Sequence, residues 1–158
     1  MMITENDYRF AIKMQVRITH PDAKIPYRKR ITDAGYDLYS VEDKVLLPGR
    51  STIVKTGICI AAPSGFYYTI DGRSSLWSQG IFPNRGIIDA TFCGEVVVSL
   101  NNLSGDDFYI ACGDRIAQII LHKQYHMEFE VVDQFSPEYA QRGLNGFGSS
   151  GGVACFEK

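Results

Sequence analysis

Two kinds of side chain in the stretch 71–102 could act on a phosphate ester and on water. Arg73 directly precedes Ser74 and Ser75, and a guanidinium beside two hydroxyls can hold phosphate oxygens. Asp89 follows an isoleucine pair, and a carboxylate can take a proton from water. Alone, each group is typical of a surface turn or a strand end. A functional interpretation therefore depends on complementary chemistry elsewhere in the chain.

The C-terminal tract 142–152 supplies such chemistry. It holds five glycines, and its only large apolar residues are a leucine and a phenylalanine, a composition that cannot form a core. A tract of this kind is usually a disordered tail. Here, however, Arg142 and the pair Ser149-Ser150 flank Phe147, so phosphate donors lie on both sides of a stacking ring. We therefore predict a glycine-rich lid.

Length and charge limit the class of protein. The 158 residues predict one domain over 1–158, with 1–10 as a mobile lead-in and 142–152 as the C-terminal lid or arm. The hydrophobic fraction of 45% and the charged fraction of 22% are ordinary for a globular protein. The formal net charge of −2 provides no basic field for a nucleic-acid backbone. A small anionic ligand is favoured, with no nucleic-acid partner.

The four cysteines are widely spread and include no CxxC pair, which fits neither a zinc site nor a small disulfide framework. Cys59 and Cys112 lie in apolar runs and are expected to be reduced core residues. The N-terminus lacks the apolar core of a signal peptide, and no run is long enough to span a membrane. We expect an intracellular, cytoplasmic protein, with a nuclear address also open.

Short apolar or alternating runs, separated by turn residues, predict many strands. These runs are 11–18, 33–40, 45–47, 52–54, 57–60, 66–70, 95–100, 107–111, 115–122 and 127–132. The only predicted helix is 75–79, with Ser74 or Ser75 as its N-cap and Gly80 at its end. Strands at this spacing, without helices between them, indicate an all-β sandwich or barrel.

Five stretches match one family in order and in spacing. They are 34–40 (AGYDLYS), 72–76 (GRSSL), 86–102 (GIID and the strand after it), 113–120 (GDRIAQII) and 142–151. In these stretches the sequence resembles the trimeric dUTPases, which hydrolyse dUTP to dUMP and pyrophosphate. The resemblance covers residues 34 to 151. It implies a dUTP diphosphatase with a distorted jelly-roll-like β-sandwich or barrel, and a homotrimer with shared active sites.

The resemblance also implies catalytic roles. Asp89 would be the general base for the water that attacks the α-phosphorus, with positioning of that water doing much of the work. Arg73 would hold the phosphate chain. Mg²⁺ would be held mainly by substrate phosphates, with Asp37 reaching it through water.

Further residues are expected to contact the substrate. Main-chain groups around 86–88 would present the donor and acceptor order of uracil, and Phe147 would stack on the base. Phe92 would lie against C2′ of the sugar and leave no room for a ribose hydroxyl. The complete set expected at the substrate is Arg73, Ser74, Ser75, Leu76, Asn84, Gly86, Ile87, Ile88, Phe92, Gln118, Arg142, Phe147, Gly148, Ser149 and Ser150.

Four positions depart from the family pattern. Phe92 stands where a tyrosine is usual, and Cys93 replaces a common arginine. Asp71 is an unusual residue so close to the motif arginine. Asn84 lies one position later than the usual uracil-contacting asparagine, with Pro83 in the expected place.

Two other functions are compatible with parts of the sequence. A dCTP deaminase shares the GRSS-type motif, but its catalytic glutamate lies in the strand that corresponds to 96–100, where this chain has Ser99. A non-catalytic β-sandwich binding module would explain the strands and the near-neutral charge. It would not explain why Asp37, Arg73, Asp89, Gln118 and Arg142 occur together.

Overall fold

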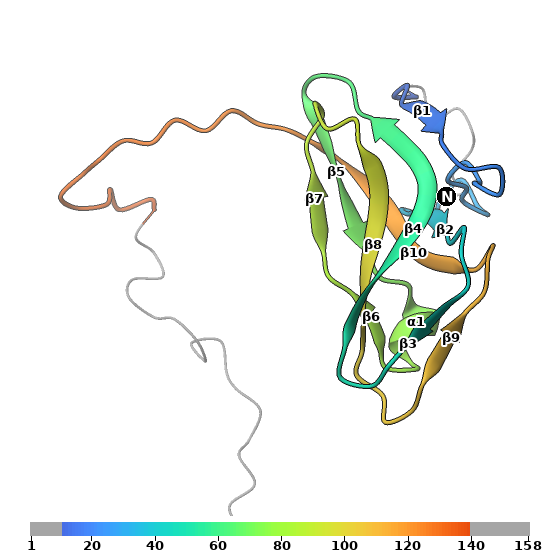
Figure 1. Cartoon of the computed structure of the whole chain (residues 1–158). Coiled ribbons are helices and arrows are strands. Elements are labelled where there is room, and N and C mark those ends of the chain that lie inside the picture. The colour runs from blue at the N-terminus through green and yellow to red at the C-terminus, as the bar shows by residue number, and fades with distance from the viewer. Residues whose placement is uncertain (1–10, 140–158) are drawn as a thin grey trace, which may run out of the picture. The chain divides into compact units, whose positions relative to one another are not determined.

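The structure is a computed structural model that describes residues 11–139 (Figure 1). Residues 11–125 form a β-sheet body, and residues 126–139 belong to a second unit. The elements of the body are β1 (Gln15–Ile18), β2 (Tyr36–Tyr39), β3 (Lys44–Leu46), β4 (Ser51–Ala61), β5 (Phe66–Asp71), α1 (Ser74–Trp77), β6 (Ile81–Pro83), β7 (Gly86–Ile88), β8 (Glu95–Asn102), β9 (Phe108–Ile110) and β10 (Arg115–Lys123). The predicted all-β class is confirmed.

The strands form two four-stranded sheets and one two-stranded sheet, and every pairing is antiparallel. The first sheet has the order β1-β4-β8-β6, and the second has the order β2-β10-β5-β7. Strands β3 and β9 pair with each other. The order β2-β10-β5-β7 matters most for function, because it brings three of the predicted motifs onto neighbouring strands.

Alternation along the strands builds a core to which both sheets contribute. On β8, Val96, Val98 and Leu100 are buried while the residues between them are more exposed. Tyr68 on β5 is fully buried, and its hydroxyl donates to the Ile60 carbonyl on β4 over 3.2 Å. This bond links the two four-stranded sheets inside the core and satisfies a polar group that would be costly to bury alone.

The predicted break between runs 52–54 and 57–60 is wrong, because β4 continues through it. The register against β8 shifts between Lys55 and Cys59, as at a β-bulge. Gly57 occupies the irregular position with φ of +65°, a conformation that glycine adopts without steric cost. Its N–H bonds to Glu95 Oε1 at 3.0 Å instead of to the ladder.

Three other expectations are corrected. Residues 127–132 form no strand, since this exposed segment has no pairing partner among residues 11–139. Cys112 is exposed, because it lies in the turn after β9, whereas Cys59 is buried as expected. The helix begins at Ser74 with Arg73 as its N-cap and no side-chain cap, although Gly80 does follow its end with φ of +78°.

Strands β6 and β7 were not predicted as separate elements. Pro83 is compatible with β6 because β6 is an edge strand, where a missing N–H leaves no ladder bond unmade. Within the described residues, no helix is long and apolar enough to cross a membrane.

Candidate active site

One row of polar residues crosses three strands of the second sheet. Gln118 on β10 pairs with Asp37 on one side and with Asp71 on the other. Neighbouring positions such as Ile70 and Ile119 point into the core, so the row lies on the opposite face. Antiparallel register thus places side chains from three distant parts of the sequence next to one another.

Asp37 is the centre of an ion-pair cluster on this row. Its Oδ1 lies 2.8 Å from Arg73 Nε, and its Oδ2 lies 3.4 Å from Arg115 Nη1. The Asp37 and Arg73 side chains are each only 18% exposed, so solvent screens their interaction less than that of a surface pair. Arg73 Nη1 also donates to the Arg115 carbonyl over 3.1 Å. These contacts fix the orientation of the Arg73 guanidinium.

Gln118 connects β10 to the turn that precedes Arg73. Its Nε2 donates to the Gly72 carbonyl over 2.7 Å. The side chain passes over Gly35, where any Cβ would overlap Gln118 Oε1. The small residue before Tyr36 is therefore a packing requirement of the glutamine position.

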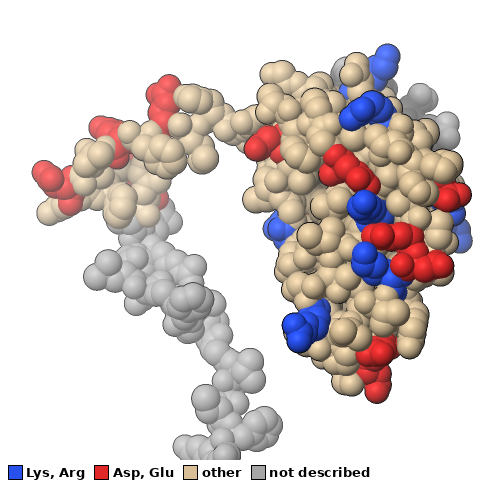
Figure 2. Space-filling view, viewed as in Figure 1, with Lys and Arg blue, Asp and Glu red and all other residues tan. Residues whose placement is uncertain are grey.

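These groups surround a cleft of about 470 Å³. It is lined by Arg28, Lys29, Asp33, Ala34, Gly35, Asp37, Arg73, Ser74, Ser75, Arg115, Gln118 and Ile120. The lining includes four cationic and two acidic side chains, in a chain whose net charge is −2. A locally positive cleft with hydroxyl donors suits a small anion. On the face drawn in Figure 2, by contrast, basic and acidic side chains are interspersed.

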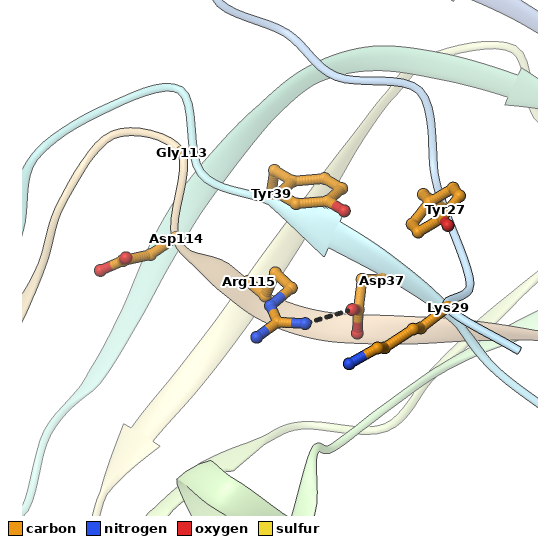
Figure 3. Close-up of a pocket in the computed structure, with 7 residues that line it drawn as sticks. All are labelled: Tyr27, Lys29, Asp37, Tyr39, Gly113, Asp114 and Arg115. Carbon is orange, nitrogen blue, oxygen red and sulfur yellow. Dashed lines mark hydrogen bonds and ion pairs between the residues drawn. The ribbon is translucent and has the colours of Figure 1, made fainter. Parts of the chain in front are cut away.

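A second cleft of about 510 Å³ adjoins the first (Figure 3). It is lined by Tyr27, Lys29, Asp37, Tyr39, Gly113, Asp114 and Arg115, of which Lys29, Asp37 and Arg115 also line the first cleft. Burial, followed by the nearby Asp37 carboxylate, raises the pKa of Tyr39 above its usual value. Tyr39 therefore keeps its hydroxyl proton at neutral pH and can donate a hydrogen bond.

Asp37, Arg73, Ser74, Ser75 and Gln118 were predicted as site residues, and the structure brings them together around the first cleft. Sequence reasoning missed Lys29 and Arg115. Arg115 lies inside the GDRIAQII stretch and Lys29 in a basic loop. The pairing of β2 with β10 brings Arg115 to Asp37, and the bridge between Tyr27 and Asp37 brings the loop of Lys29 there.

Asp89 does not line this cleft. The register of β7 against β5 pairs Gly86 with Ile70 and Ile88 with Tyr68, so the chain runs away from Arg73 as it approaches Asp89. Extending that register places Asp89 beside position 67, on the order of 15–20 Å along the sheet from Arg73 at ~3.3 Å per residue. Asp89 is exposed at the end of the edge strand β7.

Two further predicted residues have other surroundings. Leu76 is buried in the hydrophobic core. The Asn84 side chain lies against β8, where its Nδ2 donates to Ser99 Oγ over 2.8 Å and its Oδ1 accepts from Asn101 Nδ2 over 2.7 Å. The predicted residues Arg142, Phe147, Gly148, Ser149 and Ser150 lie outside the described residues.

Asp71 takes part in a polar network on the outer face of the second sheet. Its Oδ1 lies 3.2 Å from Arg85 Nε, and its Oδ2 accepts the Thr69 hydroxyl proton. Since that proton goes to Asp71, the 3.0 Å contact between Thr69 Oγ1 and His122 Nε2 needs the imidazole N–H as donor. The network thus links Asp71, which precedes Gly72, to Arg85, which precedes β7.

The chain is similar to known proteins over a region that includes all five motif stretches. Residues 21–151 match the family model described as dUTPase. The deoxyuridine 5'-triphosphate nucleotidohydrolase of Kluyveromyces lactis is 40% identical over 139 residues, which cover 87% of this chain and 93% of that one. The protein of the same name from Leptospira interrogans is 36% identical over 145 residues, which cover 89% and 99%.

Solved structures of dUTPases have a similar fold. The dUTPase of Staphylococcus bacteriophage 80alpha, as a mutant with dUpNHpp, has a TM-score of 0.81 at 27% identity, covering 88% of this chain and 98% of that chain. A mutant dUTPase from phage phi11 of S. aureus, described with a structural Mg(II) ion, has a TM-score of 0.73 at 25% identity, covering 78% and 98%.

Proposed function

Because the chain belongs to the dUTPase family, we propose that its positively charged cleft binds the phosphate chain of dUTP. The activity is that of the family: hydrolysis of dUTP to dUMP and pyrophosphate. The observation that carries the assignment of this cleft is the Asp37–Arg73 ion pair. It holds a guanidinium in a fixed orientation beside two serines and Gln118.

Each residue of the cleft has a specific part in this proposal. Arg73 and the hydroxyls of Ser74 and Ser75 hold phosphate oxygens, while Gln118 meets the α-phosphate side. Asp37 acts by holding Arg73, because a guanidinium already paired on one edge offers its other edge without losing rotamer freedom. Phosphoryl transfer depends mainly on such alignment and charge stabilisation.

Asp89 is proposed as the general base for the attacking water. Its carboxylate is exposed at the end of β7, where a water and a substrate can reach it. A base must lie within about 3 Å of the proton that it takes. The separation of 15–20 Å, inferred above at about 3.3 Å per residue, cannot be closed by an Asp side chain. Arg73 and Asp89 of one chain therefore cannot serve the same α-phosphorus.

This separation supports a homotrimer in which neighbouring chains complete each site. A closed symmetric assembly would bring Asp89 of one chain to the cleft of the next. Residues 126–139 also expose large apolar side chains, among them Phe129, Phe135 and Tyr139. These side chains are available for contact with a neighbouring chain.

Selection of deoxyuridine is proposed for the hairpin that carries β7. Main-chain groups of Gly86–Ile88 lie at a sheet edge, where one row of donors and acceptors has no strand partner among residues 11–139. Such a row can read uracil, because a rigid main chain would oppose the amino group of cytosine with a donor. Phe92 follows on the same hairpin with its ring 43% exposed, and is proposed to face the sugar.

A magnesium ion fits the donor set of the cleft if the substrate brings most of its ligands. Within residues 11–139 there is no group of three or more His, Cys, Asp or Glu side chains able to hold a metal. Each Asp37 oxygen contacts one arginine. Because a carboxylate oxygen has two lone pairs, each can still accept a bond from a metal-bound water. When bound, Mg²⁺ would neutralise charge on the phosphate oxygens.

The test is pyrophosphate release from each of the four common deoxynucleoside triphosphates and from dUTP, with and without Mg²⁺. We expect release from dUTP alone and a strong stimulation by Mg²⁺. Deamination of dCTP without pyrophosphate release would favour the deaminase alternative. No reaction with any of them would favour a binding module.

A further inference from the structure

We propose that Lys29, together with Arg115, forms a distal phosphate subsite where the two clefts meet, and that this subsite favours the triphosphate over dUDP and dUMP. The inference rests on the proposed function, since it extends the same phosphate site. Neither residue was among those assigned to the substrate from the sequence.

The position of Lys29 is the first observation. Its side chain lines both clefts, and Figure 3 shows it on the same side as the Asp37 carboxylate and the Arg115 guanidinium. Arg73, Ser74 and Ser75 line only the first cleft. A phosphate chain that begins beside these three residues and extends toward the second cleft therefore meets Lys29 and Arg115 with its far end.

The second observation concerns hydrogen-bond donors. Arg73 uses Nε on Asp37 and Nη1 on the Arg115 carbonyl. Arg115 has one long contact, 3.4 Å from Nη1 to Asp37, and its side chain is 52% exposed. Within residues 11–139, Lys29 has no hydrogen bond or ion pair. The uncommitted positive charge of the site is thus concentrated where the clefts join.

The alternative is that Lys29 is an ordinary solvated lysine. Asp37 already faces two guanidinium groups, so it offers a third cation little net attraction. The other carboxylates of the two clefts, Asp33 and Asp114, each accept a main-chain N–H bond and form no ion pair with Lys29. A terminal phosphate would bring the lysine an anionic partner. Tyr39 is a protonated hydroxyl in the second cleft and adds a neutral donor for the same oxygens.

The experiment uses the full chain as wild type, Lys29→Ala, Lys29→Arg and the control Lys55→Ala. Lys55 is an exposed lysine on β4 that lines neither cleft. Calorimetry would measure the affinity of each for dUpNHpp, dUDP and dUMP. For Lys29→Ala we expect about tenfold weaker binding of dUpNHpp, as for the loss of one charge-assisted contact, with dUDP and dUMP unchanged. Lys29→Arg should restore most of the affinity, and Lys55→Ala should change none of the three.

An unchanged affinity of Lys29→Ala for dUpNHpp, or equal weakening for all three nucleotides, would overturn the subsite. Equal loss in Lys55→Ala would do the same, because it would indicate a general charge effect. Failure of the underlying function gives a different result: wild-type chain would bind none of the nucleotides and release no pyrophosphate from dUTP.

Discussion

At the scale of single residues, Asp37 is proposed to serve the phosphate site indirectly, through the two arginines that it contacts. It holds two guanidinium groups at 2.8 and 3.4 Å and so keeps cations together that would otherwise repel each other. The position of Phe92 is likewise set by its neighbours. Phe92 N–H bonds back to the Asp89 carbonyl over 3.1 Å, and the ring then lies against Gly94.

Gly94→Ala tests the proposed role of Phe92. A Cβ at position 94 would lie 2.7 Å from Phe92 Cζ, so the ring must move while the backbone can stay. We expect a folded protein whose preference for dUTP over UTP falls by roughly tenfold, the lower range for a steric discrimination. Steady-state kcat/KM for both nucleotides is the measurement, and an unchanged ratio would remove Phe92 from sugar selection.

Tyr68→Phe tests the bond between the sheets. Burial raises the pKa of Tyr68 to about 12 from the ordinary 10.0. Below pH 10 the hydroxyl is protonated in the folded and the unfolded chain alike, whereas between pH 10 and 12 only the unfolded chain ionises. The free energy of unfolding must therefore fall as pH rises through that window.

In Tyr68→Phe the part of this fall in the free energy of unfolding that comes from Tyr68 should disappear. At pH 7 the variant should lose about 1 kcal/mol, because the Ile60 carbonyl is left without its donor. Urea denaturation at pH 7 and between pH 9 and 12 would measure both effects. If the wild type and the variant lose stability in parallel above pH 10, another group is responsible.

Residue types were easier to predict than residue neighbours. Asp37, Arg73 and Gln118 could be named from the sequence because a phosphate site needs their chemistry and their spacing matches a known family. Arg115 and Lys29 were missed because nothing local distinguishes a cleft-lining cation from a solvated one. Leu76 shows the converse, since its neighbours in the GRSSL motif line the cleft while its own side chain faces the core.

At the scale of elements, strand pairing brings site residues together that lie far apart in the sequence. The apolar runs at 95–100 and 115–122 predicted β8 and β10 well, because each strand buries several of its apolar side chains. The sequence pattern could not predict that β10 lies between β2 and β5, because partners far apart in sequence leave no local signal. It also failed at 127–132, where alternation is present but no strand partner is.

The Asp71–Arg85 pair is a link between elements that can be tested by a double-mutant cycle. Asp71 precedes the turn to Arg73, and Arg85 precedes β7, so the pair fixes the start of one functional segment against the other. We expect Asp71→Asn and Arg85→Gln each to lower kcat/KM a few-fold, and the double variant to be no worse than either. Their effect on stability should stay within about 1 kcal/mol, because Arg85 is 64% exposed. Strictly additive losses in kcat/KM would show that the two residues act separately.

At the scale of the whole molecule, the chain keeps a small negative net charge while concentrating positive charge in one cleft. This distribution suits a small anionic nucleotide and avoids general attraction to polyanions. The proposed homotrimer accords with the same geometry, because Arg73 and Asp89 lie at opposite ends of β5 and its partner β7. In that proposal each site draws the two residues from different chains.

The most direct test of the account is complementation between two inactive chains. Asp89→Asn keeps the shape of the base but cannot accept a proton, and should cost about 10²–10⁴-fold in turnover. Arg73→Ala removes the phosphate clamp. Co-expressed in equal amounts with different tags and purified through both, the two variants form mixed assemblies. If each site takes Arg73 from one chain and Asp89 from the next, every trimer that carries both tags holds one intact site among its three. We therefore predict dUTP turnover of about one third of wild type from parents that are each nearly inactive. Mixed assemblies no more active than their parents would contradict the shared site.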